Sequence, residues 1–395
     1  MDENKALSIY IHIPYCISKC SYCDFFSRGG CKSIPDEYVD ALCREIKVRS
    51  CREQSAAFTA WKTVYIGGGT PSLLTEGQLE KICNAISDSK SLSQEAEFTI
   101  EVNPDDLTHS FIEALKKTPV NRISVGIQSL NEKSLSFAKR RASAAQNISA
   151  LECISKNWKG RFSLDLICGL PYESEASFLQ GLEKVISYNP DHISMYSLTF
   201  EEETPFGKML DRELSDYDFD FSDKLWLEGR KLLKKEGYSQ YEVSNFSKAG
   251  FESLHNLSYW NHQPYLGCGS GATGSFYDGS RGRRITNTAD IEDYCSFWNT
   301  CKGEEEPSKN IISVEEFDEE TSSFEFFMMG LRKLSGVKES DYFNIFSKKI
   351  PDSVKKLAEN WQKKGLCQIS DTDGDYSFTL GEKGILYLNS FVTDL

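Results

Sequence analysis

The chain lacks several features that would each point to a broad class of protein. No apolar run reaches membrane-spanning length, and residues 1–8 are too polar for a secretory signal. Positive charge is in deficit, because 45 Lys and Arg face 59 Asp and Glu for a net charge of −14. That balance argues against binding a nucleic-acid backbone. The absence of a membrane span, a secretory signal, excess positive charge and internal repeats predicts a cytoplasmic, globular protein with no nucleic-acid partner.

Cysteine is abundant, at 13 residues, but the number is odd and no export signal accompanies it. This combination favours a reducing compartment in which thiols stay free or bind metal. Hydrophobic residues make up 39% of the 395 positions, enough for a packed core. The length suits one large domain plus a smaller one.

Six short β-branched runs alternate with amphipathic stretches over the first two-thirds of the chain. Such strand–helix units predict parallel strands joined by right-handed helical crossovers. An open partial barrel and a doubly wound sheet both fit this α/β pattern. Chemically distinctive residues follow every predicted strand, as at the mouth of (β/α) barrels, so we favour a partial (β/α)6 barrel. The predicted strands cover residues 8–13, 63–66, 97–102, 122–127, 162–167 and 192–198, and the helices 36–48, 77–86, 110–117, 145–156 and 174–187.

The pattern changes after residue 260. A Gly-rich stretch at 267–274 predicts a loop, and residues 303–308 predict a charged linker. From Ile312 onward we expect the chain to be helical. An Asp-Gly turn at 373–374 predicts a hairpin, which suggests a small winged-helix-like module. We divide the chain into a barrel (1–245), a connecting region (246–305) and a C-terminal helical or winged domain (306–395).

Three cysteines stand close together after the first predicted strand, as Cys16, Cys20 and Cys23. Thiolates on one short loop are typical ligands of iron–sulfur clusters. Three ligands on a 4Fe–4S cluster leave one iron open, and S-adenosylmethionine (SAM) could chelate it through its amine and carboxylate. A structural zinc site is the alternative. Such a site needs four protein ligands around the ion, and no second cysteine pair lies at a suitable spacing.

Polar groups at the other strand ends could hold SAM. The glycines of 67–69, ahead of Thr70, let backbone groups approach a ligand closely. Each of these features is common on its own, and their convergence at one mouth is what indicates a site. The polar candidates are Glu101, Gln128, Arg140 and Asp165.

Stretches of the chain from Tyr10 to Trp260 resemble the radical SAM proteins related to oxygen-independent coproporphyrinogen III oxidase, the HemN/HemW family. The stretches are YIHIPYCISKCSYCDF, YIGGGTPS, IEVNPD, NRISVGIQS, DLICGLP, YSLTFEEETPF and HNLSYW. The resemblance implies that Cys16, Cys20 and Cys23 ligate a 4Fe–4S cluster. It also implies SAM contacts from Tyr10, Gly68, Gly69, Thr70, Glu101, Gln128, Arg140 and Asp165.

The HemW branch is the more similar of the two. The oxidase branch carries a further cysteine where this chain has Phe25, and an N-terminal arm before its first strand. HemW proteins are understood as haem chaperones, which makes the HNLSYW segment a candidate haem site, with His255 as ligand beside Asn256, Tyr259 and Trp260. A packed structural histidine is the alternative, and His12, next to the cysteines, is the main rival ligand.

Some positions depart from the family. Gly-Ala-Thr-Gly stands at 271–274 in place of Gly-Ala-His-Gly, Ala142 replaces a histidine, and Glu202-Glu203 replaces Pro-Gly. The leading hypothesis is a haem chaperone that serves acceptors such as membrane-associated respiratory enzymes, with homodimers suggested by the family. The alternative from another class is an enzyme, coproporphyrinogen III oxidase.

Overall fold

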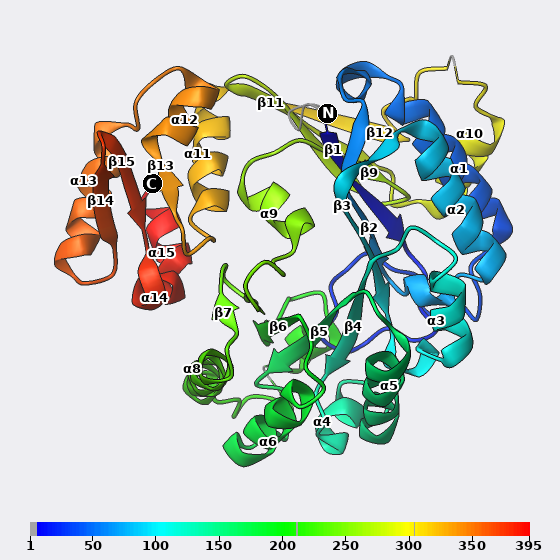
Figure 1. Ribbon diagram of the computed structural model, residues 1–395, viewed down its shortest axis with the longest axis horizontal. Helices are drawn as coiled ribbons and strands as arrows, with labels where there is room; N and C mark the ends of the chain where they lie inside the picture. Colours follow the sequence, from blue (N-terminus) through cyan, green and yellow to red (C-terminus); the bar gives the residue numbers. More distant parts are fainter. Residues whose placement is uncertain (1–5, 211, 304) are drawn as a thin grey trace.

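The computed structural model describes residues 6–210, 212–303 and 305–395. Within them, one twelve-stranded sheet runs in the order β12-β11-β10-β9-β1-β2-β3-β4-β5-β6-β8-β7, and a separate sheet has the order β13-β15-β14. Figure 1 shows the large sheet curving around a central space, with the small sheet in a module to one side.

The six central strands are parallel and adjacent in chain order, which confirms the open (β/α)6 barrel. Helices cover their outer face (Figure 1). The strands are β1 (Ala6–Ile13), β2 (Ala60–Gly68), β3 (Ser91–Val102), β4 (Arg122–Gln128), β5 (Arg161–Cys168) and β6 (His192–Ser197). The helices between and after them are α1 (Asp36–Ser50), α2 (Glu76–Ser89), α3 (His109–Leu115), α4 (Glu132–Phe137), α5 (Ala144–Asn157), α6 (Glu175–Ile186), α7 (Pro205–Met209) and α8 (Phe219–Lys235).

Alternation along each strand separates an apolar outer layer from a polar interior. Ile9 and Ile11 of β1 are fully buried in the main core, whereas the intervening Tyr10 lies on the opposite face of the sheet. The same alternation places Glu101 and Asp165 on the inner face. The barrel therefore encloses polar side chains, unlike the apolar layers that fill closed (β/α)8 barrels.

Four strands extend the sheet beyond β1, and here two predictions were wrong. The first of them runs parallel to β1, and the next three are each antiparallel to the strand before. The Gly-rich stretch is not one loop, because β9 (Tyr265–Cys268) and β10 (Thr273–Asp278) include half of it. A Cβ on Gly267 would lie 2.2 Å from the Thr273 carbonyl oxygen, so glycine permits the close approach of these strands. The chain from Ile312 begins with a strand, β12 (Ile312–Phe317), which pairs antiparallel with β11 (Arg281–Asn287). Side-chain ion pairs such as Arg283–Glu316 add to this pairing.

The large sheet ends, on the side of β6, with the two short strands β8 (Asn245–Ser247) and β7 (Ser239–Gln240). The short helix α9 (Leu254–Trp260) follows, and α10 (Ile291–Thr300) packs beside α1. Figure 1 places α9 between the barrel and the C-terminal module.

The C-terminal module has its own core of aromatic residues, including Phe327, Trp361 and Phe378. The predicted hairpin is confirmed, since Asp373 and Gly374, both with positive φ, join its two strands. Its helices and strands are α11 (Glu319–Gly330), β13 (Val337–Lys338), α12 (Glu339–Phe346), α13 (Asp352–Lys363), β14 (Gln368–Thr372), β15 (Asp375–Thr379), α14 (Gly381–Gly384) and α15 (Leu388–Thr393). The division of the chain at residues 245 and 305 stays a prediction.

Among the helices of the described segments, none combines the length and the apolar character needed to cross a membrane.

Candidate cluster and S-adenosylmethionine site

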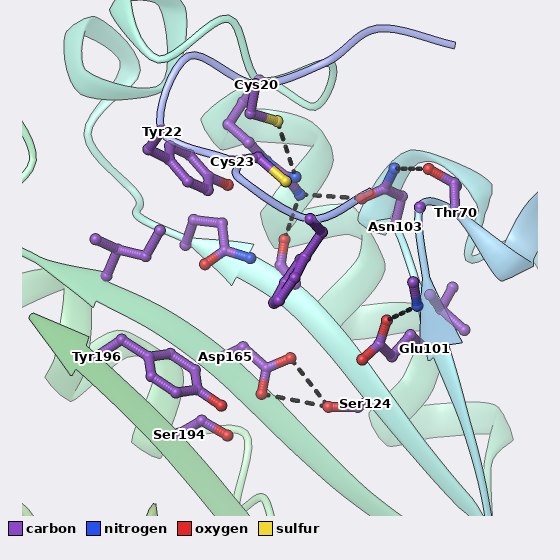
Figure 2. A pocket seen from close by; sticks show the side chains of 18 of the residues that line it. Cys20, Tyr22, Cys23, Thr70, Glu101, Asn103, Ser124, Asp165, Ser194 and Tyr196 are labelled. Atoms are coloured by element: carbon purple, nitrogen blue, oxygen red, sulfur yellow. Dashed lines mark hydrogen bonds between the residues drawn. The ribbon is translucent and has the colours of Figure 1, made fainter. Parts of the chain in front are cut away.

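A cavity of about 460 Å³ opens where the carboxyl ends of the barrel strands meet. Figure 2 shows the side chains of its wall converging from the cysteine loop and the strand ends. Most of the predicted site residues line it: Cys16, Cys20, Cys23, Gly68, Gly69, Thr70, Glu101, Gln128, Arg140, Asp165 and Asn256. The predicted residues Tyr10, His255, Tyr259 and Trp260 do not line the cavity.

The three loop cysteines are free thiols that face this cavity. The Cys16 thiol accepts a hydrogen bond from the Thr70 hydroxyl at 3.4 Å, and the Cys20 thiol accepts one from Arg140 Nη1 at 3.5 Å. Burial is the main cause that raises the pKa of the Cys23 thiol, to about 11. Donors thus already approach two of the sulfurs that would become thiolates.

His12 supports the cysteine loop from the end of β1. Its Nε2 donates to the carbonyl of Phe26, 2.9 Å away, so the Nδ1 atom accepts from the Tyr10 hydroxyl at 2.8 Å. Burial lowers the pKa of His12, which keeps the ring neutral. His12 and Tyr10 therefore position the loop from behind the cavity, and neither ring nitrogen of His12 is open to a ligand.

The thiols fit a 4Fe–4S cluster better than a single ion. In the described segments, no three His, Cys, Asp or Glu side chains converge closely enough to hold one metal ion. A 4Fe–4S cluster does not require such convergence, because each thiolate binds a different iron. The three cysteines and the adjoining space would hold the cluster, and a structural zinc site would need a closer, four-ligand set.

Glu101 is joined to the Gly-rich loop after β2. Its carboxylate accepts from the Gly68 N–H at 3.1 Å and from the Tyr65 hydroxyl at 2.8 Å. Burial, helped by the nearby Asp165 carboxylate, raises the pKa of Glu101 to about 7. A cationic ligand would favour its ionised form, and the SAM sulfonium and ammonium groups carry such charge.

The end of β4 shows local backbone strain at a cavity residue. Gln128 has a φ of 64°, in the left-handed region that non-glycine residues rarely adopt, and the β4–β5 register shifts beside it. A Cβ on Gly126 would lie 2.8 Å from Gln128 Nε2. Glycine at 126 therefore makes room for the Gln128 side chain, and its carbonyl accepts from Arg140 Nη2 at 2.6 Å.

Arg140 and Asp165 supply opposite charges to the cavity. The Arg140 Nη2 atom also donates to Asn103 Oδ1 at 3.1 Å, while its buried Nε atom has no partner among the described residues. Asp165 accepts from the Ser124 hydroxyl at 3.0 Å, and burial raises its pKa. Both charges are therefore available to a ligand with separate anionic and cationic ends, as the methionyl part of SAM has.

The sequence prediction did not name several cavity residues, although Asn103 and Tyr196 stand within the stretches that carry the family resemblance. Asn103, Ser194 and Tyr196 line the cavity, and Figure 2 places them around the predicted set. Alternation is the signal that could have found the last two, since they lie two residues apart on the inner face of β6.

His255 is packed away from the cavity. Only 1% of the residue is exposed. Its Nδ1 forms a hydrogen bond with the Thr63 hydroxyl and its Nε2 one with the Tyr259 hydroxyl, both at 2.7 Å. The ring stacks on Tyr65 with 5.0 Å between centroids. Burial lowers the pKa of His255 to about 3, so the ring is neutral, and neither nitrogen is open to iron while α9 keeps this position.

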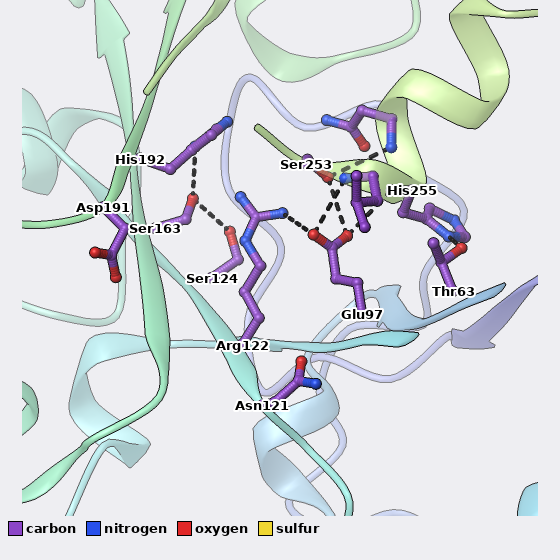
Figure 3. A network of polar contacts seen from close by, with 12 residues as sticks. Thr63, Glu97, Asn121, Arg122, Ser124, Ser163, Asp191, His192, Ser253 and His255 are labelled. Carbon is purple, nitrogen blue, oxygen red and sulfur yellow. Dashed lines mark hydrogen bonds and ion pairs between the residues drawn. The ribbon is translucent and has the colours of Figure 1, made fainter. Parts of the chain in front are cut away.

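A buried carboxylate fixes the start of α9 inside the barrel (Figure 3). Glu97 accepts from the backbone N–H groups of Leu254 and His255, each at 3.1 Å, and from the Ser253 hydroxyl at 3.4 Å. Arg122 pairs with the same carboxylate at 3.5 Å. Glu97 therefore joins α9 to β3 and β4.

The remaining HNLSYW residues point in different directions. Asn256 lines the cavity, and the Tyr259 ring packs edge-on against Tyr265. The Trp260 ring lies 5.3 Å from the guanidinium of Arg332, which belongs to the C-terminal part of the chain. The structure thus brings only Asn256 of this group to the predicted SAM site.

When bound, the cluster and SAM supply one-electron reductive cleavage of a sulfonium. The protein residues would bind and orient these groups: the thiols would hold the cluster, Glu101 and Asp165 could take the cationic groups of SAM, and Arg140 its carboxylate.

Comparisons with known proteins show which family the chain belongs to. The family model of the Radical SAM superfamily matches residues 10–185. Heme chaperone HemW of Buchnera aphidicola subsp. Schizaphis graminum (strain Sg) is 34% identical over 395 residues, which cover 98% of this chain and 97% of that protein. Heme chaperone HemW of Escherichia coli (strain K12) is 32% identical over 393 residues, with 98% and 97% covered.

The solved structure of coproporphyrinogen III oxidase (HemN) from Escherichia coli, a radical SAM enzyme, superposes with a TM-score of 0.76 at 20% identity. The superposition covers 99% of this chain and 90% of that one, and shows that the fold is shared. From the extent and level of identity to its relatives, the chain belongs to the HemW family of the radical SAM superfamily.

Proposed function

We propose that this protein is a haem chaperone that binds a 4Fe–4S cluster, SAM and haem, and passes haem to acceptor proteins. The observation that carries the proposal is the similarity to heme chaperone HemW, which extends over 97% of two relatives. Phe25 supports it, because this side chain lines the cavity and is 65% exposed where the oxidase branch has a cysteine.

For the haem site we retain His255 as the axial ligand, in a form of the protein in which α9 has moved out of the barrel. Imidazole is a common haem ligand. The Thr63 bond to the His255 ring, together with the Glu97 contacts to α9, opposes this movement. The bond between His255 and Tyr259 lies within α9 and moves with it. The proposed haem site is therefore closed in the present structure and opens by release of α9.

A Soret titration of the anaerobic, cluster-loaded protein tests this function. We expect saturable haem binding by the wild type and at least tenfold weaker binding by His255→Ala. His109→Ala is the matched control, because His109 is an exposed histidine far along the chain from α9. Equal haem binding by wild type and His255→Ala would remove His255 from the site, and absence of haem binding by the wild type would refute the function.

The shared fold with HemN makes coproporphyrinogen III oxidation the second candidate. Incubation of the cluster-loaded protein with SAM, a reductant and coproporphyrinogen III separates the two. We expect no protoporphyrinogen IX. Its formation together with 5′-deoxyadenosine would favour the oxidase.

The wider setting also belongs to this proposal. We propose cytoplasmic residence, haem acceptors among membrane-associated respiratory enzymes, and a homodimer. Size-exclusion chromatography with light scattering tests the dimer, and haem transfer to an apo-acceptor, followed by the Soret shift, tests delivery.

A further inference from the structure

A second cavity, of about 310 Å³, lies on the other face of the sheet from the SAM cavity. Leu266 of β9 is fully buried there, whereas its neighbour Tyr265 contacts Tyr259 on the inner side. The volume falls at the low end of the roughly 300–1,000 Å³ of small-molecule sites. It is also far larger than the voids that close-packed interiors normally leave.

One wall of this second cavity is apolar and buried, whereas the residues of 306–314 that line the other side are half-buried or exposed. Leu266, Phe276 and Ile285 come from three neighbouring strands, and none is more than 5% exposed. Trp298 of α10 completes the wall, and its buried indole N–H has no hydrogen-bond partner among the described residues.

One end of the cavity carries positive charge. Arg49, 8% exposed, uses only its Nη1 atom toward the described residues, with bonds to Glu45 Oε1 (2.8 Å), the Gly267 carbonyl (2.7 Å) and Asn287 Oδ1 (3.4 Å). The Nε and Nη2 atoms of this buried guanidinium donate no hydrogen bond to the described residues.

Two further cations stand near the cavity opening. Arg52 and Lys309 line it, and Glu306 is the one carboxylate that the described residues add to the lining, 3.5 Å from Arg52. Glu45 lies behind the wall and pairs with Arg49. Among the described residues, three cations therefore face two carboxylates at this end of the cavity, which leaves it positively charged.

We propose that this cavity is a binding site for a small amphiphilic carboxylate, such as a medium-chain fatty acid. The alkyl chain lies among Leu266, Phe276, Ile285 and Trp298, and the carboxylate accepts from the unused donors of Arg49. The site is separate from the cluster, SAM and haem, and stands whether or not the chaperone function does.

Octanoate is the probe, titrated into the full-length, cluster-loaded protein by calorimetry and by tryptophan fluorescence. We expect octanoate to bind at least tenfold more tightly than octanol, which has the same chain without the charge, and octylamine not to displace it. The fluorescence change disappears in Trp298→Phe while the heat of binding persists. Equal affinity for octanoate and octanol, or no heat with octanoate, would overturn the proposal.

Two variants address the two ends of the site without removing the buried Arg49. Ile285→Phe adds volume inside the cavity and should weaken octanoate binding more than tenfold. Lys309→Gln removes a charge at the opening and should weaken it about threefold. Lys356→Gln, an exposed lysine of α13, is the matched control and should have no effect. Unchanged octanoate affinity in a folded Ile285→Phe protein, shown by circular dichroism, would also overturn the site.

Discussion

Replacing Thr63 by Val should make haem bind more tightly, although Thr63 itself need not touch haem. The Thr63 hydroxyl holds His255 Nδ1 at 2.7 Å inside the barrel. Valine has nearly the same shape and cannot form this bond. The closed position of α9 therefore loses stability, and the fraction of protein with His255 released increases.

The size of the effect follows from the hydrogen bond. A typical net contribution of about 0.5–1.5 kcal/mol corresponds to a shift of about 2- to 12-fold in the closed–released equilibrium. Apparent affinity scales with the released fraction while that fraction is small, so the haem Kd should fall by the same factor. The buried Nδ1 left without a partner adds to the effect in the same direction.

A Soret titration measures this change, with Thr99→Val as the matched control. Thr99 is also fully buried, on the neighbouring strand β3, and its hydroxyl has no partner among the described residues. Its replacement should leave haem affinity unchanged. An unchanged or weaker affinity in Thr63→Val would refute the reasoning that His255 must be released to bind haem.

Three further outcomes are expected. Cys23→Ala should lose iron and acid-labile sulfide, whereas Cys31→Ala should retain both, because Cys31 does not line the cavity; equal loss in both would contradict the assignment. SAM affinity, measured by calorimetry, should fall by up to about tenfold per pH unit as the pH drops through about 7, because Glu101 becomes protonated. Glu101→Gln should flatten this pH profile, and an equally steep pH profile in the variant would count against a role of Glu101 in binding. Glu97→Ala should lower the free energy of unfolding by about 3–5 kcal/mol in urea titrations, because Arg122 is left as an unpaired buried charge; a loss below about 1 kcal/mol would show that the pair is not stabilising.

The barrel and much of the site could be predicted because their signals are local. Each of the six strands is a short β-branched run, and the distinctive residues follow directly at its carboxyl end. Parallel strands with crossovers bring those ends to one mouth, so the cysteine loop, Glu101 and Asp165 meet as expected. The side chain of Gln128 also reaches the cavity, although no sequence signal indicates its positive φ.

The errors come from contacts that no local sequence pattern indicates. Glycines that indicated a loop serve the close approach of β9 and β10, and the paired β11 edge holds residues 312–317 in a strand despite the acidic run at its end. The surroundings of His255 were equally hidden, since its partner Thr63 lies 192 residues away. A motif predicts which residues act together, but not which of them face solvent.

The bond from His12 to the Phe26 carbonyl bears on how the protein acquires iron. It joins the far end of the cysteine loop to the barrel wall through a bond that involves no cluster ligand. The part of the loop that this bond orders therefore loses its conformational entropy during folding rather than during metallation. Zinc fingers show the opposite order, folding only when the ion arrives. A chelator should therefore strip the cluster and leave a folded apoprotein that can be reloaded.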